Sequence, residues 1–465
     1  MLFNSIEFII FFPLVTVLYF LVPYKFRWLL LLLASCFFYA AFIPSYLLIL
    51  FFLIIIDYFA GLLIEIKLNK KFWLTISIIA NVLLLGLFKY YDFFISNINQ
   101  ITGSDFILLH WILPIGLSFH TFQSMSYTIE VYRGRQKAIR HAGYYALYVM
   151  FYPQLVAGPI ERPQNLFPQF FKEQKFSSQK LYEGLRLMAW GFFKKLVIAD
   201  RIGHFSDAVF SNPTQAGTLT TWLAIFFFSI QIYADFSGYT DIAIGAARCM
   251  GINLSLNFNR PYQSVNIREF WRRWHISLSS WFRDYVYIPL GGNRKGRLRK
   301  DLNLLITFIV SSFWHGAGWT FIVWGLLHGI YTLIYDNIKK YFAISIPAFF
   351  AWLLTCTCVA FAWIFFRASS INNAVQIIYK SVDFKAISFK NILEVPGANI
   401  ELGNFSLAFS FCMIAYMFLI EKFTTPKMFE LIFKKNMDIF IFSSSILLII
   451  FFGVFQKSSF IYFQF

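Results

Sequence analysis

The chain has 465 residues, of which 58% are hydrophobic and only 14% are charged. Soluble proteins carry about a quarter charged residues, so the composition excludes a water-soluble multidomain enzyme and indicates an integral membrane protein. The net charge of +17 does not require a nucleic-acid partner. Cytoplasmic loops of membrane proteins are rich in Lys and Arg, and they account for this excess. The five cysteines match neither a zinc-binding pattern nor a disulfide framework.

Apolar runs follow one another along the whole chain. A helix needs about 20 mostly apolar residues to cross a bilayer, and the first run, 2–22, lacks the basic leader and cleavage site of a signal peptide. Further helices are expected near 27–43, 46–64, 72–94, 106–130, 144–157, 185–200, 219–234, 303–316, 319–335, 347–366, 405–420 and 438–455. Because several runs are short or polar, we predict an all-α polytopic protein with about eleven transmembrane helices plus broken or re-entrant pieces.

Basic residues between the apolar runs predict the orientation in the membrane. The short turn at Pro44 carries no Lys or Arg, whereas the turns before and after it do. The basic clusters that can all be cytoplasmic together are 25–27, 67–71, 294–300, 339–340 and 422–435. Both termini are therefore expected at the outer face of the membrane.

The centre of the chain differs from the rest, since 133–183 and 255–302 combine Arg, Lys, Pro, Gln and Asn with many aromatic residues. Within 268–282, large apolar residues recur at helical spacing and the charged residues share another sector. The apolar set is Trp271, Trp274, Leu278, Trp281 and Phe282. This pattern predicts an amphipathic helix lying near the inner headgroups.

Two of the seven histidines, His275 and His315, lie in unusual surroundings 40 positions apart. His315 follows Ser311 and Ser312 and precedes Gly316. An imidazole within a bilayer needs polar partners or water, so these small and polar neighbours indicate an aqueous cavity. The alternative interpretation is that His315 is a hydrogen-bonded packing residue at a helix end.

Six stretches together resemble the membrane-bound O-acyltransferases, in particular the bacterial branch that acylates envelope polysaccharides. The most specific is Phe313-Trp-His-Gly-Ala-Gly-Trp, and the C-terminal Phe460-Ile-Tyr-Phe-Gln-Phe also matches. The other four are 151–163, 233–245, 257–262 and 271–289. The resemblance thus covers most of the chain.

The resemblance implies one acyltransferase domain over 1–465, with a ring of helices around a funnel or tunnel. It assigns His315 as the catalytic histidine, His275 as the upstream family position, and Tyr462 as the carrier of the acyl group. The alternative role for His275 is structural, in a tunnel wall or a carrier-docking helix. It also implies a thioester donor, acetyl-CoA or an acyl carrier, with no tightly bound cofactor and no metal. The expected location is the bacterial cytoplasmic membrane, with a periplasmic O-acetyltransferase partner and both termini periplasmic.

Tyr462 also has a physical argument in its favour. A thiol has a pKa near 8.5 and a phenol near 10, so an acyl group moved from a thioester to tyrosine keeps most of its transfer potential. Full deprotonation of a phenol by an imidazole of pKa about 6.5 is uphill by about 5 kcal/mol, so proton removal must accompany attack. The alternative role for Tyr462 is an interfacial aromatic anchor.

Five further residues are predicted to bind substrate or donor: Trp314, Asp235, Ser237, Arg294 and Lys295. Trp314 adjoins the catalytic candidate, and a carboxylate within the bilayer costs about 2.5–3.5 kcal/mol, so Asp235 is expected to face protein, water or an Arg partner. Arg294 and Lys295 belong to a basic run that would attract donor phosphates. The alternative for that run is a cytoplasmic loop contacting anionic lipid.

Three functions remain open on the sequence. The first is an acetyltransferase acting on a cell-envelope polysaccharide, peptidoglycan in preference to alginate, through a partner, because the chain lacks a Gly-x-Ser-x-Gly nucleophile motif. The second is a transporter or flippase for a lipid or sugar, but the paired broken helices of transporters are not evident. The third is a scaffold for an export complex, with both histidines merely packed.

Overall fold

Helices form almost all of the regular structure in the computed structural model. The described residues are 1–67, 69–155, 158–341, 346–383, 394–395, 400–401, 403–423, 435–455 and 460–461. Within them, two antiparallel two-residue strands, β1 (Glu394–Val395) and β2 (Ile400–Glu401), supply the β-structure. The prediction of an all-α protein is confirmed.

The chain divides into two compact units, and each contains segments from separate parts of the sequence. The first unit comprises 1–191 and 239–255, and the second comprises 192–238 and 256–465. Helix α12 (Thr218–Cys249) therefore contributes its N-terminal part to the second unit and its C-terminal part to the first. The prediction of one domain over 1–465 stays a prediction.

The first unit is a helical bundle whose bounds are α1 (Ile6–Leu21), α2 (Tyr24–Ala40), α3 (Tyr46–Glu65), α4 (Lys70–Leu85), η1 (Gly86–Tyr90), α5 (Tyr91–Thr102), α6 (Leu117–Tyr132), α7 (Ala142–Met150), α8 (Tyr152–Leu155), α9 (Pro163–Phe170) and α10 (Ser178–Phe192). Helix α3 packs against α4 and α6. At this contact the buried Asp57 accepts hydrogen bonds from Ser77 Oγ (2.6 Å) and Asn81 Nδ2 (2.9 Å). These partners satisfy the carboxylate and give Asp57 a structural role.

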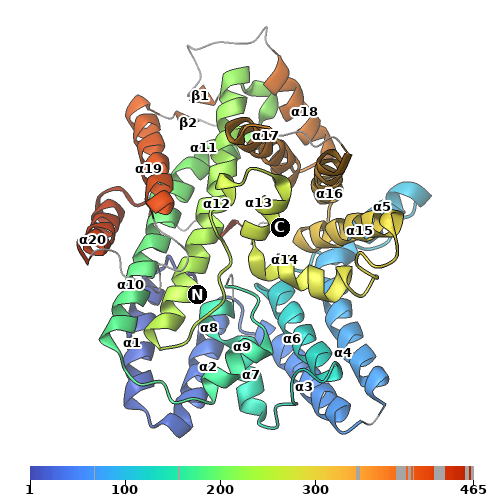
Figure 1. Cartoon of the computed structure of the whole chain (residues 1–465), viewed down its shortest axis with the longest axis vertical. Coiled ribbons are helices and arrows are strands. Elements are labelled where there is room, and N and C mark those ends of the chain that lie inside the picture. The colour runs from blue at the N-terminus through green and yellow to red at the C-terminus, as the bar shows by residue number, and fades with distance from the viewer. Residues whose placement is uncertain are drawn as a thin grey trace. The chain divides into compact units, whose positions relative to one another are not determined.

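The second unit contains η2 (Phe193–Ala199), α11 (Asp200–Ser211), η3 (Pro213–Gln215), η4 (Pro261–Gln263), α13 (Ile267–Arg273), α14 (Ile276–Phe282), η5 (Arg283–Tyr287), α15 (Arg297–His315), α16 (Trp319–Tyr341), α17 (Ala348–Arg367), α18 (Ile371–Val382), α19 (Asn404–Phe423) and α20 (Lys435–Phe452). Helix α16 packs against both α15 and α17 (Figure 1). A Cβ at Gly325 of α16 would lie 2.3 Å from Ser312 Oγ of α15. Glycine at 325 therefore allows α15 and α16 to approach closely.

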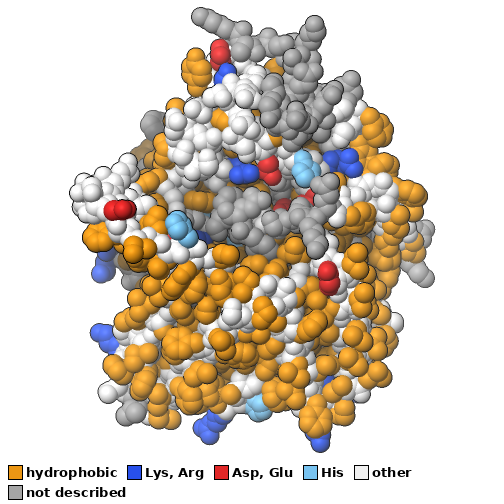
Figure 2. All heavy atoms as spheres, turned by 180° about the vertical axis from the view of Figure 1, so that it is seen from behind, with side chains coloured by type: hydrophobic (Ala, Val, Ile, Leu, Met, Phe, Trp, Pro, Cys, Tyr) orange, Lys and Arg blue, Asp and Glu red, His pale blue; other side chains and the backbone are white. Residues whose placement is uncertain are grey.

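Five helical segments in the described part of the chain are long and apolar enough to span a membrane: Tyr46–Glu65, Lys70–Thr102, Thr218–Cys249, Ala348–Arg367 and Phe405–Phe423. Two shorter apolar helices, Ile6–Leu21 and Ile439–Phe452, accompany them. Large apolar side chains on such helices are exposed, for example Leu48 at 73%, and hydrophobic side chains cover much of the surface in Figure 2. A surface of this kind is solvated by lipid, so the chain is a polytopic membrane protein. The predicted number of about eleven crossings stays a prediction.

The expected helix over 106–130 is shorter than the sequence predicts. Residues 105–114 are not helical, and α6 begins only at Leu117. Pro114 lies just before this start, and Gly116 adopts a left-handed conformation with φ of 77°. Proline lacks an amide hydrogen and glycine tolerates positive φ, so this pair marks the helix start.

The amphipathic segment 268–282 is two short helices rather than one. Helix α13 ends at Arg273, and His275 adopts a left-handed conformation with φ of 43° before α14 begins. The backbone is diverted because the Ile276 amide donates to the Asn257 carbonyl (2.9 Å) instead of to a preceding helical turn. This tertiary hydrogen bond overrides the continuous periodicity of the sequence.

Candidate active site

The end of α15 delivers His315 into the core of the second unit. His315 is 3% exposed and is the last residue of its helix, since the following Gly316 is extended. A Cβ at Gly316 would lie 2.1 Å from the Phe321 ring, so the chain leaves the helix through a space that only glycine fits. The His315 ring lies against Trp324 of α16 and Phe366 of α17, with ring centroids 5.1 and 5.7 Å away.

The side-chain amide of Asn257 orients His275. Asn257 Oδ1 accepts hydrogen bonds from the Ser277 backbone N–H (3.2 Å) and from Ser277 Oγ (2.9 Å), and it lies 3.0 Å from His275 Nδ1. Because this oxygen is an acceptor, the arrangement assigns the imidazole proton to Nδ1 and the lone pair to Nε2. Burial lowers the pKa of His275 to about 3, so its ring is neutral at physiological pH.

The two histidines are neighbours although they are 40 positions apart in the sequence. Their ring centroids are 6.4 Å apart, and Trp314 lies within 6.4 Å of His275. The Phe236 ring of α12 meets His275 edge-on at 4.7 Å and 90°. The structure therefore brings together His275, His315 and Trp314, three of the residues that the sequence singles out.

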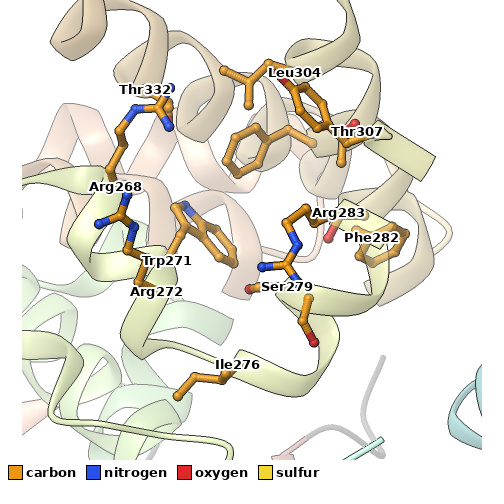
Figure 3. A pocket seen from close by; sticks show the side chains of 14 residues that line it. Arg268, Trp271, Arg272, Ile276, Ser279, Phe282, Arg283, Leu304, Thr307 and Thr332 are labelled. Carbon is orange, nitrogen blue, oxygen red and sulfur yellow. The ribbon is translucent and has the colours of Figure 1, made fainter. Parts of the chain in front are cut away.

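A cavity of about 470 Å³ lies beside the histidines in the same unit. Its wall includes Ile276, which follows His275, and Ser311, one helical turn before His315. Three arginines, Arg268, Arg272 and Arg283, also line it. Figure 3 shows Trp271 and Arg283 on facing sides of this cavity. The cavity thus combines an apolar, aromatic wall with three guanidinium groups.

The arginines of the cavity differ in how they are paired. Arg268 forms an ion pair with Asp336 of α16, and Arg283 pairs with the adjacent Asp284 at 2.8 Å. Arg272 is exposed and, in the described part of the chain, has no carboxylate partner. Among the described residues, no acidic side chain forms an ion pair with Arg272, in contrast to Arg268 and Arg283.

The basic residues predicted to attract the donor, Arg294 and Lys295, lie in the exposed loop between η5 and α15. This loop starts at Tyr287, which lines the cavity, and the Gly292 amide donates to the Tyr287 carbonyl (2.9 Å). Asn303 Nδ2 of α15 donates to the Gly292 carbonyl (3.0 Å) and fixes the other side of the loop. A donor-binding role for Arg294 and Lys295 stays a prediction.

Asp235 and Ser237 lie on α12 and face two buried lysines of η2. Asp235 Oδ1 is 2.9 Å from Lys195 Nζ, and Lys194 Nζ donates to Ser237 Oγ (2.9 Å). Asp235 faces protein, as expected, but its cationic partner is a lysine and not an arginine. Substrate binding by Asp235 and Ser237 stays a prediction.

Tyr462 lies outside the described residues. The two residues before it are described and fully buried, with Phe460 at 0% and Ile461 at 1% exposure. The Phe460 ring contacts Phe236 at 5.3 Å, and Phe236 in turn contacts His275. The described end of the chain is therefore separated from His275 by one phenyl ring.

Two residues of this region were not singled out by the sequence. Asn257 orients His275, and its only signal was that it opens the 257–262 stretch. Lys195 holds Asp235, and its signal was a charged residue within the apolar run 185–200, where a partner is required. Metal-binding clusters of three or more His, Cys, Asp or Glu are absent from the described residues.

Comparison with known proteins gives one family. The model of the membrane-bound O-acyltransferase family matches residues 106–377, which include both histidines and the whole cavity wall. A peptidoglycan O-acetyltransferase of Helicobacter pylori is 39% identical over 77% of this chain and 74% of the relative.

Relatives that act on other polymers are also similar. A probable alginate O-acetylase of Pseudomonas aeruginosa is 36% identical over 88% of this chain and 80% of the relative. A teichoic acid D-alanyltransferase of Bacillus subtilis is 28% identical over 59% of this chain and 71% of the relative. By name, these relatives are thus an O-acetyltransferase of peptidoglycan, a probable O-acetylase of alginate and a D-alanyltransferase of teichoic acid.

Proposed function

The chain belongs to the membrane-bound O-acyltransferase family, and from this premise we propose that it moves an acetyl group from a cytoplasmic thioester to the outer face of a bacterial cytoplasmic membrane. It is an acyltransferase, and its similarity to acetylases of peptidoglycan and alginate supports a cell-envelope polysaccharide as the final acceptor. The donor is acetyl-CoA or an acyl carrier thioester, and a periplasmic partner completes the transfer.

One observation carries the proposal: two buried histidines, one from the turn between α13 and α14 and one from the end of α15, converge beside an arginine-lined cavity. A thioester donor combines a phosphate-bearing carrier with an apolar acyl arm. Guanidinium groups bind phosphate with charge-assisted hydrogen bonds, and Arg272 has a charge available for this contact. The aromatic wall around Trp271 suits the arm that leads toward His315.

In the proposed reaction His315 is the general base. The Tyr462 oxygen attacks the thioester carbonyl carbon while its proton passes to His315, the C–S bond breaks, and the thiolate leaves with that proton as a free thiol. The acetyl group is then held as an aryl ester, which the periplasmic partner transfers to a sugar hydroxyl. Neutral His275, with its lone pair on Nε2, supports the acceptor side of the same step.

Replacement of His315 tests the proposal. His315→Ala should lower acetyl transfer from labelled acetyl-CoA by about 10²–10⁴-fold, the usual contribution of a general base, while the protein still folds. His204→Ala is the matched control, since His204 is exposed on α11 of the same unit. Unaltered transfer by a folded His315→Ala protein would show that this imidazole is not the base.

The acyl carrier is tested separately at Tyr462. Tyr462→Phe should abolish transfer without changing the melting temperature, and mass spectrometry of the wild-type C-terminal peptide should show an acetyl adduct when the partner is omitted. A peptide that stays unmodified under these conditions would remove Tyr462 from the mechanism and leave His315 in place.

The polymer is tested with the partner present. We propose peptidoglycan, which the Helicobacter pylori relative supports, and the acetyl content of purified cell wall should fall on loss of this chain. Loss of acetyl from a secreted alginate-like polymer with unchanged cell wall would reverse the assignment.

A further inference from the structure

A cluster of buried ions lies away from the cavity wall in the second unit. Lys195 of η2 is 1% exposed, and its Nζ lies 2.8 Å from Asp200 of α11 and 2.9 Å from Asp235 of α12. Both carboxylates are nearly as buried as the lysine. Buried ions are costly unless each is paired and hydrogen-bonded. Their presence in this unit therefore points to a specific role for the cluster.

The cluster holds the end of the chain. Lys195 contacts Oδ1 of Asp235, and the other oxygen, Oδ2, accepts a hydrogen bond from the Ile461 backbone N–H at 2.8 Å. Two further bonds tie the end of α20 and the residues after it to η2 and α11: the Val454 amide donates to the Leu196 carbonyl (3.0 Å), and Arg201 Nη2 donates to the Phe452 carbonyl (2.7 Å). The described residues on both sides of 456–459 are thus attached to η2, α11 and α12.

The residues held in this way adjoin the catalytic candidates. Phe460 packs on Phe236, and Phe236 packs edge-on against His275. Phe236 is the residue next to Asp235 on α12, so the same helical turn holds the Ile461 amide and contacts the imidazole. A change that releases Ile461 would therefore act beside His275.

The chemistry of the contact favours a carboxylate at 235. A backbone N–H bound to an ionised carboxylate forms a charge-assisted hydrogen bond, which is roughly twice as strong as a neutral one. Lys195 Nζ lies 2.9 Å from the other oxygen of this carboxylate and favours its ionised form, and Asp200 lies 2.8 Å from the lysine. The three side chains therefore act together to present one strong acceptor to one backbone amide.

We infer that Lys195, Asp200 and Asp235 form a seat for the C-terminal segment and that Asp235 is a positioning residue for acyl transfer. The inference rests on the proposed function, because its purpose is to place the residue after Ile461. Consecutive Cα atoms are about 3.8 Å apart, so fixing Ile461 fixes the point from which Tyr462 departs. Asp235 acts through the backbone and not on the substrate.

Cysteine labelling in the full-length protein tests the seat without requiring activity. Ile461→Cys is made together with Cys412→Ser, which removes an exposed native thiol, and the parent without the 461 cysteine gives the background. In this protein the 461 thiol should be protected from maleimide. Adding Asp235→Leu, which removes both charge and acceptor, should raise its labelling rate at least about tenfold, the effect of a local opening made easier by about 1.4 kcal/mol.

Two further variants separate the seat from general destabilisation. Asp235→Asn keeps an oxygen acceptor for the Ile461 amide, so its labelling should stay between the parent and Asp235→Leu. Asp207→Asn is the matched control, because Asp207 lies about two turns further along α11 and pairs with Arg367 instead of Lys195, and it should label as the parent does. Protection that is the same in folded Asp235→Asn, Asp235→Leu and parent proteins would overturn the seat.

Steady-state kinetics test the positioning role in proteins that keep Ile461. Asp235→Leu should lower kcat at least about tenfold while KM for acetyl-CoA changes by less than about twofold, because donor binding does not use the seat. Asp235→Asn should recover part of kcat. Increased labelling with unchanged kcat would overturn the positioning role, whereas a wild-type protein without acyl transfer would overturn the proposed function and leave the labelling result standing.

Discussion

At the residue scale, one oxygen atom organises the upstream histidine. Asn257 Oδ1 is buried and accepts hydrogen bonds from the Ser277 backbone N–H, the Ser277 hydroxyl and His275 Nδ1. The Ser277 backbone N–H can only donate, so this contact decides which way the Asn257 amide points. The tautomer of His275 therefore depends on a residue 18 positions away, which sequence spacing does not reveal.

Removing this oxygen should destabilise the protein and disturb catalysis together. Asn257→Ala leaves buried donors without their acceptor, and we expect the free energy of unfolding to fall by about 1–3 kcal/mol. Thermal unfolding in detergent measures the loss. Asn259→Ala is the control, since Asn259 lies two residues away and its backbone amide, which survives the substitution, donates to the Arg273 carbonyl. Equal melting temperatures for the two variants would contradict the role given to Asn257.

The lowered pKa of His275 predicts a pH dependence of stability. Its pKa is about 3 in the folded protein and about 6.5 when unfolded, so the unfolded state binds more protons between these values. Stability should therefore fall as the pH drops below 6.5, by about 2 kcal/mol between pH 7 and pH 5. His275→Asn should lack this component, and the difference between the two unfolding curves at pH 7 and pH 5 measures it. Parallel pH dependence of both proteins would show that His275 is not buried as a neutral ring.

At the element scale, the close approach of α15 and α16 places His315. Gly325 of α16 faces both Ser312 Oγ and the Phe308 carbonyl oxygen of α15, whereas Gly329, one turn later, faces the tip of the Leu305 side chain. A backbone carbonyl cannot move without moving its helix, but a leucine tip can rotate. The two glycines on α16 therefore differ in how easily their neighbours could accommodate an added methyl group.

A matched pair of substitutions tests this packing. Gly325→Ala should force α15 and α16 apart, lower stability by about 1–3 kcal/mol, and reduce transfer because His315 ends α15. Gly329→Ala adds the same methyl group one turn away and should cost less, since the new Cβ would meet Leu305 Cδ2 at 2.8 Å. Differential scanning fluorimetry and transfer assays rank the two. A larger loss at 329 than at 325 would contradict the assigned contacts.

The break between α13 and α14 shows where element prediction fails. Periodicity over 268–282 describes one amphipathic helix, and the apolar residues it selects, such as Trp274 and Leu278, are indeed buried. The helix nevertheless stops because the 257–259 segment captures the Arg273 carbonyl and the Ile276 amide. Hydrogen bonds to a distant segment leave no periodic signal, so burial was predictable and the kink was not.

At the scale of the whole molecule, the distribution of basic residues predicts which loops face the cytoplasm. The loop with Arg294 and Lys295 should be cytoplasmic, and the segment after α5 should lie outside. Asn293→Cys should therefore react with a membrane-impermeant maleimide only after the cells are permeabilised, whereas Asp105→Cys should react in intact cells. Both positions are exposed, and Cys412→Ser removes the exposed native thiol. The reverse labelling pattern would contradict the predicted topology and the proposed direction of acyl transfer.

The sequence by itself determined the class of protein, the apolar helices and the residues of the histidine motif, because composition, hydropathy and local motifs are carried by neighbouring residues. The tertiary structure alone decided that His275 and His315 are adjacent, that Asn257 orients one of them, and that Asp235 pairs with Lys195 and Ile461. These contacts join residues between 18 and 226 positions apart. Such pairings depend on how the helices pack, and no local pattern in a single sequence encodes them.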